Sequence, residues 1–241
     1  TLITNTHANR EKEAERMVAG EKKGVVLLDF WVSPFAQRCR IALAEKGLAY
    51  ESVEQVLLGD KGDLLLRSNP VHKKVPVLLH DGRAVCESLV ILEYIEDAFP
   101  LATPRLLPAD PFARAQARFW ADYVDKTVYG IGTRLWRLKG EQRAAARAEM
   151  LETLRTLDAE LGDRAFFAGE AFGFVDVALI PLTSWFYSYE KHGGFSVQAE
   201  FPRLAEWARR CGERDSVAKI LTKPEEVLDF IGVLKKHYGV E

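Results

Sequence analysis

The sequence predicts two domains, a small domain that mixes strands and helices and then an all-helical domain. Short apolar runs that suit buried strands alternate with helical segments only in the first hundred residues or so. A proline-rich segment, "PLATPRLLPADP", follows them. From there to the end, apolar residues recur at helical spacing. We expect an α/β domain over 24–100, a linker over 101–110 and a helical domain over 111–241.

The α/β domain begins with "GVVLLDFWV", which is too short for a helix and suits a buried strand. Ser33 is a good N-cap for the helix that follows, and Gly47 stops it. A second strand is expected over 50–56 and a helical turn over 61–69. The Asp-Gly pair in "VPVLLHDGRAVCE" predicts a hairpin, and "SLVILEYIEDAF" a helix. The order β-α-β-α-β-β-α matches a domain of thioredoxin type.

The helical domain starts at Asp110-Pro111, which caps a long helix that runs to the break at Gly140. An amphipathic helix then ends at Gly162. A further helix follows Gly173, and we expect its cap to rest on Asp176 because glycine is a weaker N-cap. Three more helical segments follow: "PRLAEWARRCGER", "SVAKIL" and "PEEVLDFIGVLKKHYG".

The composition excludes several classes of function. A net charge of -2 gives no general attraction to nucleic acid or to an anionic membrane. No apolar run approaches the length of a membrane span. Cys39, Cys86 and Cys211 lie far apart, so neither a disulfide framework nor a metal site is expected. We expect a cytoplasmic protein, and we expect residues 1–23 to be a polar extension, of which 1–16 has no role.

Three places in the α/β domain could carry chemistry. Ser33 could serve only as a helix cap, or its hydroxyl and the helix N-terminus could stabilise an anion such as a thiolate. A serine-protease-like triad is poorly supported, since the nearest histidine is His72 and no nucleophile elbow is present. Val75-Pro76 could be an ordinary edge-strand proline, or a bend that leaves the backbone of Val75 free to pair with a peptide ligand.

The third place is Glu87-Ser88, directly before an apolar helix. Ser88 could cap that helix while Glu87 is a surface acid. Alternatively, the helix N-terminus could bind a ligand carboxylate while Glu87 pairs with a ligand ammonium group. A ligand with a thiol, a peptide backbone and a γ-glutamyl head group would use all three places, and glutathione is such a ligand.

At these residues the sequence resembles the glutathione transferases, in particular the plant tau class. The matching stretches include "LLDFWVSPFAQRCRIALAEKG", "NPVHKKVPVLLHDG", "VCESLVILEYI", "LLPADPFARAQARFWADYVDK" and "FGFVDVALIPLTSWF". The resemblance extends over about 24–238. It implies a thioredoxin-like domain that binds glutathione, a helical domain that binds an electrophile, and a cis bond at Val75-Pro76.

The resemblance also implies roles for individual residues. Ser33 is the catalytic residue, which donates a hydrogen bond to the glutathione sulfur, and Phe35 lies beside it. The residues implied to hold the rest of glutathione are Lys61, Lys74, Val75, Pro76, Glu87 and Ser88. One inserted residue in "EQVLLGDKGDLL" makes Lys61 less secure than Lys74. The walls of the electrophile site would be Tyr129, Thr133, Trp136, Trp185, Phe230 and Leu234, although aromatic residues at helical spacing often belong to a core.

The implied activity is conjugation of the glutathione thiolate to hydrophobic electrophiles, with peroxide reduction as a side activity. The implied setting is detoxification of xenobiotics such as herbicides and the response to stress. Glutathione is the expected co-substrate, no metal is expected, and the implied assembly is a homodimer. Two alternatives stay open: a non-catalytic, ligandin-like carrier of hydrophobic molecules, and a glutathione-dependent thiol oxidoreductase. The oxidoreductases of this kind carry a cysteine where Ser33 stands, which disfavours that alternative.

Overall fold

The structure is a computed structural model that describes residue 12, residues 15–16 and residues 23–240. Most of the polar extension expected over 1–23 therefore lies outside the described residues. The chain divides into two compact units between Arg105 and Leu106, inside the segment expected to be a linker.

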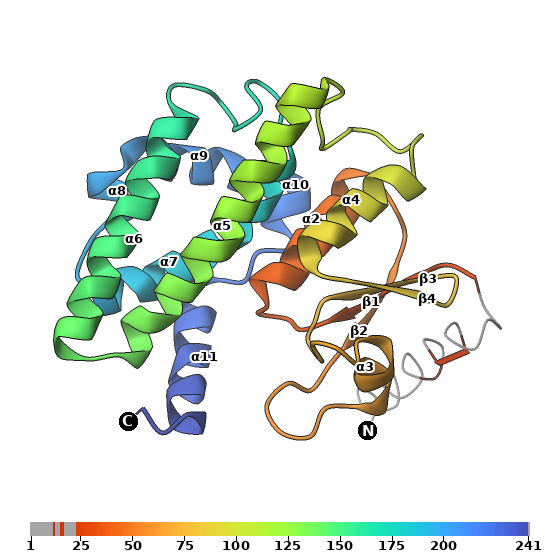
Figure 1. Ribbon diagram of the computed structural model, residues 1–241, viewed down its shortest axis with the longest axis horizontal. Helices are drawn as coiled ribbons and strands as arrows, with labels where there is room; N and C mark the ends of the chain where they lie inside the picture. The colour runs from red at the N-terminus through yellow and green to blue at the C-terminus, as the bar shows by residue number, and fades with distance from the viewer. Residues whose placement is uncertain (1–11, 13–14, 17–22, 241) are drawn as a thin grey trace. The chain divides into compact units, whose positions relative to one another are not determined.

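The first unit is built on a mixed sheet of four strands (Figure 1). The strand order is β2-β1-β3-β4, in which β1 is parallel to β2 and antiparallel to β3, and β3 is antiparallel to β4. Asp81 and Gly82 join β3 to β4 of the predicted hairpin, with the positive φ values, 49° and 80°, that a type I′ turn requires. The strands are β1 (Val25–Asp29), β2 (Glu51–Glu54), β3 (Val77–His80) and β4 (Arg83–Cys86).

Helices cover both faces of this sheet (Figure 1). Val26 and Leu28 of β1 share one buried cluster with Leu64 and Leu65 of α3 (Asp63–Ser68). Leu27 points to the opposite face because side chains alternate along a strand, and it is fully buried there. The helices α2 (Pro34–Glu45) and α4 (Ser88–Ala98) pack together on that second face. The unit therefore has the predicted thioredoxin-like arrangement.

A buried ion pair fixes the end of the first unit. Lys46 Nζ lies 2.7 Å from Glu96 Oε1, and both side chains are almost completely buried. The same ammonium group donates to the carbonyl oxygens of Ala102 and Pro104, at 3.0 and 3.2 Å. Buried polar groups are costly unless they are paired and hydrogen-bonded, as Lys46 is here. These contacts fasten the chain that leaves α4 to the end of α2.

The second unit consists of helices joined by loops, with an isolated β-bridge between Phe166 and Gly169 (Figure 1). Its central helix is α7, which packs against α5 and α11 and is apolar and buried on most of its surface. The bounds are α5 (Pro111–Arg137), α6 (Gly140–Leu161), α7 (Phe174–Gly193), α8 (Val197–Glu200), α9 (Pro202–Gly212), α10 (Asp215–Ala218) and α11 (Pro224–His237). The sequence reading did not predict α8; the other helices match predicted segments.

One close contact joins α5 to α7. Gly132 of α5 faces the ring of Tyr189 of α7, and a Cβ built on Gly132 would lie 2.1 Å from Tyr189 Cζ. Tyr189 is fully buried. Glycine at 132 therefore provides the space that the tyrosine ring fills.

The start of α7 is held by Asp176, as predicted. Its carboxylate accepts hydrogen bonds from Gly173 N at 2.8 Å, Phe167 N at 3.0 Å and Trp207 Nε1 at 2.8 Å. Burial raises the pKa of Asp176 from its ordinary 3.8 to about 6, even though the three donors favour the charged form. The carboxylate thus joins the helix start, the preceding loop and α9.

Candidate glutathione and electrophile sites

Ser33 is the N-cap of α2. Its Oγ accepts a hydrogen bond from Ala36 N at 3.3 Å, and the side chain is buried. A hydroxyl group can accept at its oxygen and donate its hydrogen at the same time. The cap therefore leaves the O–H of Ser33 able to donate to an anion, so the two roles considered for this residue are compatible.

Arg38, which the sequence reading missed, lies one turn further along α2. It is fully buried, its guanidinium carbon lies 5.0 Å from the centre of the Phe35 ring, and its NH1 group donates to Ser88 Oγ at 3.0 Å. Arg38 thereby connects the beginnings of α2 and α4. The signal in the sequence is weak: a cation three residues after Phe35, in a helix with few other charges on its buried face.

The bond between Val75 and Pro76 is cis, as the family resemblance implies. Pro76 directly precedes β3, which has a neighbour on each side in the sheet. The interpretation of Pro76 as an edge-strand proline is therefore wrong. Among the described residues, the N–H and C=O groups of Val75 have no recorded hydrogen-bond partner, so this backbone is open to an extended peptide.

The loop before Val75 is organised by the buried residue Asn69. Its side chain donates to Lys74 O at 3.0 Å and accepts from His72 N at 3.0 Å. Lys61 Nζ donates to Lys73 O at 2.7 Å. Hydrogen bonds therefore hold the side chain of Lys61 and the backbone oxygens of Lys73 and Lys74 in this loop. The side chain of Lys74 is exposed.

Glu87 and Ser88 lie at the start of α4. Glu87 is the N-cap, with φ of 69°, and Ser88 is the first helical residue. The interpretation of Ser88 as the N-cap is therefore wrong by one position, and its buried hydroxyl accepts from Arg38 instead. The exposed carboxylate of Glu87 lies 3.8 Å from His72 Nε2. Contacts through Arg38 and His72 thus connect the three sequence-predicted places in this unit.

The cysteines of the first unit are poorly placed for redox chemistry. Cys39 is fully buried, and burial raises the pKa of its thiol. Burial, followed by the nearby charge of Glu87, also raises the pKa of Cys86. Because the thiolate is the reactive form, neither residue supplies a nucleophile readily. The described residues also contain no cluster of His, Cys, Asp or Glu suited to a metal ion.

The predicted electrophile walls come from three helices of the second unit. Tyr129, Thr133 and Trp136 belong to α5, Trp185 to α7, and Phe230 and Leu234 to α11. The ring of Trp185 makes edge contacts with Tyr129 and Phe230, with centroid separations of 5.4 and 6.5 Å. The three helices therefore bring part of the predicted set together around Trp185.

Burial divides this set into two groups. Trp136, Trp185 and Leu234 are at most 8% exposed and belong to the core of the unit. Tyr129, Thr133 and Phe230 are only partly buried and can present atoms to a ligand. Burial raises the pKa of Tyr129, so its hydroxyl stays protonated and remains a hydrogen-bond donor at neutral pH.

Known proteins match both units. The family model for the N-terminal domain of glutathione S-transferases matches residues 27–104, and the model for the C-terminal domain matches residues 140–210. A probable glutathione S-transferase GSTU1 from Oryza sativa subsp. japonica is 67% identical over 231 residues, which cover 92% of this chain and 99% of the relative. Glutathione S-transferase U25 from Arabidopsis thaliana is 52% identical, with 90% of this chain and 97% of the relative covered.

Solved structures agree with these matches. The crystal structure of rice GST1 in complex with glutathione is 66% identical, has a TM-score of 0.86, and covers 90% of this chain and 99% of its own. The tau-class glutathione S-transferase of mango, Mangifera indica, is 38% identical with a TM-score of 0.82, and covers 88% of this chain and 98% of its own. The chain therefore belongs to the glutathione S-transferase family, and within it to the tau class.

Proposed function

We propose that this transferase conjugates the thiolate of glutathione to hydrophobic electrophiles, and that Ser33 activates the thiolate without being covalently modified. The supporting observation is the geometry of Ser33, whose oxygen caps α2 through Ala36 N and whose hydrogen remains a donor. The positive end of the helix dipole at the same place favours a negative charge. A serine at this position leaves the sulfur to be supplied by glutathione.

The chemistry follows from the thiol. A free thiol with a pKa near 8.5 is only slightly ionised at neutral pH, and the thiolate is the nucleophile. A downward shift of about two units requires about 2.7 kcal/mol, which a hydroxyl donor and a helix N-terminus can supply together. In a substitution the thiolate forms a carbon–sulfur bond and the leaving group departs with its electron pair. In an addition the electron pair moves to the acceptor, which then takes a proton from solvent.

The other predicted residues fit the parts of glutathione by their chemistry. The backbone of Val75 can pair with the cysteinyl residue, and Lys61 and Lys74 provide positive charge for the glycyl carboxylate. The exposed carboxylate of Glu87 can take the γ-glutamyl ammonium group in place of His72. Ser88 accepts from Arg38 and can still donate to the γ-glutamyl carboxylate.

Tyr129, Thr133 and Phe230 are the members of the predicted wall that can touch an electrophile, while Trp136, Trp185 and Leu234 support them. The aromatic character of this set favours apolar, ring-containing electrophiles. Detoxification of such compounds in the cytoplasm and peroxide reduction as a side activity are part of the proposal. None of the described helices is both long enough and apolar enough to cross a membrane.

Ser33 is the residue that tests the proposal. The rate of glutathione conjugation to a chloronitrobenzene should fall by about 100-fold in Ser33→Ala. Removing one hydrogen-bond donor that stabilises an anion in an active site usually costs about that much. Ser196→Ala is the matched control, because Ser196 caps α8 through Ala199 N at the same 3.3 Å and is not assigned to the site. The control should keep full activity.

Ser33→Cys distinguishes the reaction types. A cysteine at a helix N-terminus has a lowered pKa, so this variant should gain thiol-transferase activity through a mixed disulfide with glutathione. If Ser33→Ala matched the wild type in conjugation, the assigned role of Ser33 would be wrong. A wild-type protein that bound glutathione but conjugated nothing would favour the carrier alternative.

A homodimer is the remaining part of the proposal. Sedimentation velocity of the purified chain should give twice the mass of one chain at micromolar concentration. A single species with the mass of one chain would contradict the dimer and leave the proposed chemistry unaffected.

A further inference from the structure

The side of α5 that carries two residues of the predicted electrophile wall ends in an arginine. Tyr129, Thr133 and Arg137 follow one another at intervals of four residues, which places them in a row along one side of the helix. With a rise of about 1.5 Å per residue, the row is about 12 Å long. A molecule of that length in contact with Tyr129 can therefore reach the guanidinium group of Arg137.

The end of α11 lies beside this row. Tyr238 directly follows α11, and the guanidinium carbon of Arg137 lies 4.6 Å from the centre of its ring. The same carbon lies 5.9 Å from the centre of the Trp136 ring. Burial raises the pKa of Tyr129, and the nearby hydroxyl group of Tyr238 raises it further. Tyr238 therefore lies near Arg137 and near Tyr129, at the two ends of the row.

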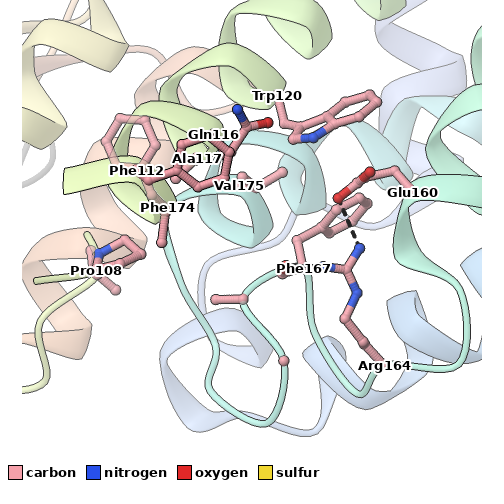
Figure 2. Close-up of a pocket in the computed structure, with 14 residues that line it drawn as sticks. Pro108, Phe112, Gln116, Ala117, Trp120, Glu160, Arg164, Phe167, Phe174 and Val175 are labelled. Carbon is pink, nitrogen blue, oxygen red and sulfur yellow. Dashed lines mark hydrogen bonds and ion pairs between the residues drawn. The ribbon is translucent and has the colours of Figure 1, made fainter. Parts of the chain in front are cut away.

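The charge of Arg137 is available to a ligand. Arg134, almost one turn earlier, forms a bidentate pair with Glu149, at 2.6 and 2.9 Å. Arg164, in the loop after α6, is paired with Glu160 at 2.9 Å (Figure 2). Arg137 differs from both: within the part of the chain that the structure describes, no carboxylate pairs with it and no acceptor takes its hydrogens.

An arginine in the last turn of a helix can act on the helix dipole alone. That role needs no aromatic neighbour, whereas here two rings hold the guanidinium group. A guanidinium group that contacts rings through its flat face keeps its N–H groups for a carboxylate. We propose that Arg137 binds a carboxylate of the electrophile, so that the transferase selects aromatic electrophiles that carry a negative charge at one end. This inference rests on the proposed conjugation and names a substrate class for it.

The test compares an acid with its neutral ester. Ethacrynic acid carries an electrophilic enone and a carboxylate at opposite ends of one ring, and its methyl ester lacks the charge. The measured quantity is the ratio of the KM for the acid to the KM for the ester, after the uncatalysed rate is subtracted. Arg137→Gln should raise this ratio about fivefold, because only the acid loses an ion pair.

Lys139→Gln is the matched control. Lys139 is an exposed cation two residues after Arg137 and lies outside the row, so its removal changes the net charge equally and should leave the ratio unchanged. Tyr238→Ala removes the nearer ring and should raise the ratio about threefold. Tyr238→Phe keeps that ring and should match the wild type. Tyr238 is 51% exposed, so neither change should disturb the core.

Two kinds of failure can be told apart. The inference would be wrong if Arg137→Gln kept the ratio of the wild type, or if Lys139→Gln raised it equally. It would also be wrong if the wild type conjugated a chloronitrobenzene but not ethacrynic acid, and the proposed function would then stand. A wild type that conjugated none of the three compounds would overturn the proposed function, and the inference with it. A rise confined to Arg137→Gln and Tyr238→Ala would establish the assignment.

Discussion

The starts of α2 and α7 each contain a side-chain oxygen that accepts a backbone hydrogen bond, a hydroxyl in α2 and a carboxylate in α7. Each helix begins with backbone N–H groups that need an acceptor. At α2 the acceptor is the hydroxyl of Ser33, which receives one bond from Ala36 N. At α7 the first helical N–H group, that of Phe174, donates to Leu106 O. The carboxylate of Asp176 accepts from the N-cap Gly173 N, from Phe167 N in the preceding loop and from Trp207.

The difference separates a helix start that can also bind a ligand from one that only stabilises the fold. A carboxylate can only accept, and that of Asp176 is buried and surrounded by protein donors. A hydroxyl retains a hydrogen that it can donate, so Ser33 can cap its helix and still serve a ligand. We therefore expect substitutions at α7 to change the stability of the protein and substitutions at α2 to change its activity.

The largest effect is expected for Asp176→Ala. The change leaves three buried N–H groups without their acceptor, and each such group costs about 1–3 kcal/mol. The free energy of unfolding, measured with urea, should fall by about 4 kcal/mol. The activity per folded molecule should stay near that of the wild type, and a selective loss of activity instead would contradict the assigned role.

The pH dependence of stability tests the same carboxylate. The pKa of Asp176 is about 6 in the folded protein and 3.8 ordinarily, so the folded state binds the proton more tightly than the unfolded chain. This group therefore adds stability as the pH falls through about 6, and that contribution is lost as the pH rises again. Between about pH 6.5 and 4.5 the stability of the wild type should gain about 2 kcal/mol relative to Asp176→Asn. A constant difference between the two proteins would show that the pKa is not raised.

An intermediate effect is expected for Arg38→Leu. The native Arg38 connects the start of α2 to Ser88. Loss of a hydrogen bond from a charged donor costs about 1.5 kcal/mol, so the KM for glutathione should rise about tenfold. The kcat should change less, because Arg38 positions Ser88 and is not placed at the sulfur. Arg38→Lys should restore part of the affinity. A loss of stability with an unchanged KM would mean that Arg38 is only structural.

The smallest effect on stability is expected for the caps themselves. Ser33→Ala and Ser196→Ala each remove a hydrogen bond of the same length from a helix start. Both should lower the free energy of unfolding by about 1 kcal/mol or less. If only Ser33→Ala also loses conjugation, the contrast between capping and catalysis is sharpened. A Ser33 variant that lost several kcal/mol would instead make its inactivity a folding defect.

The sequence predicted the order of strands and helices because each long element has a clear period or a turn signal. It missed α8, which has only four residues and is too short to show a helical period. It placed the α4 cap at Ser88 instead of Glu87, since helix ends cannot be located to one residue from a pattern.

The candidate sites were less predictable than the fold. Ser33 and Val75 lie at element boundaries that the sequence marks directly. Arg38 was missed because the burial of a cation depends on its tertiary partners. Trp136 and Trp185 belong to the core, and helical spacing alone does not separate a core residue from a pocket wall.

The contact between Gly132 and Tyr189 restricts the order in which this protein can change. A larger residue at 132 would meet the tyrosine ring, so that substitution alone should be harmful. Once position 189 carries a shorter side chain, the same substitution would fill the vacated space and become acceptable. The double variant can be reached by two orders of substitution. The single variant changed at 132 should be much less fit than the single variant changed at 189. Lineages that now carry both residues are expected to leave this combination only through a change at 189.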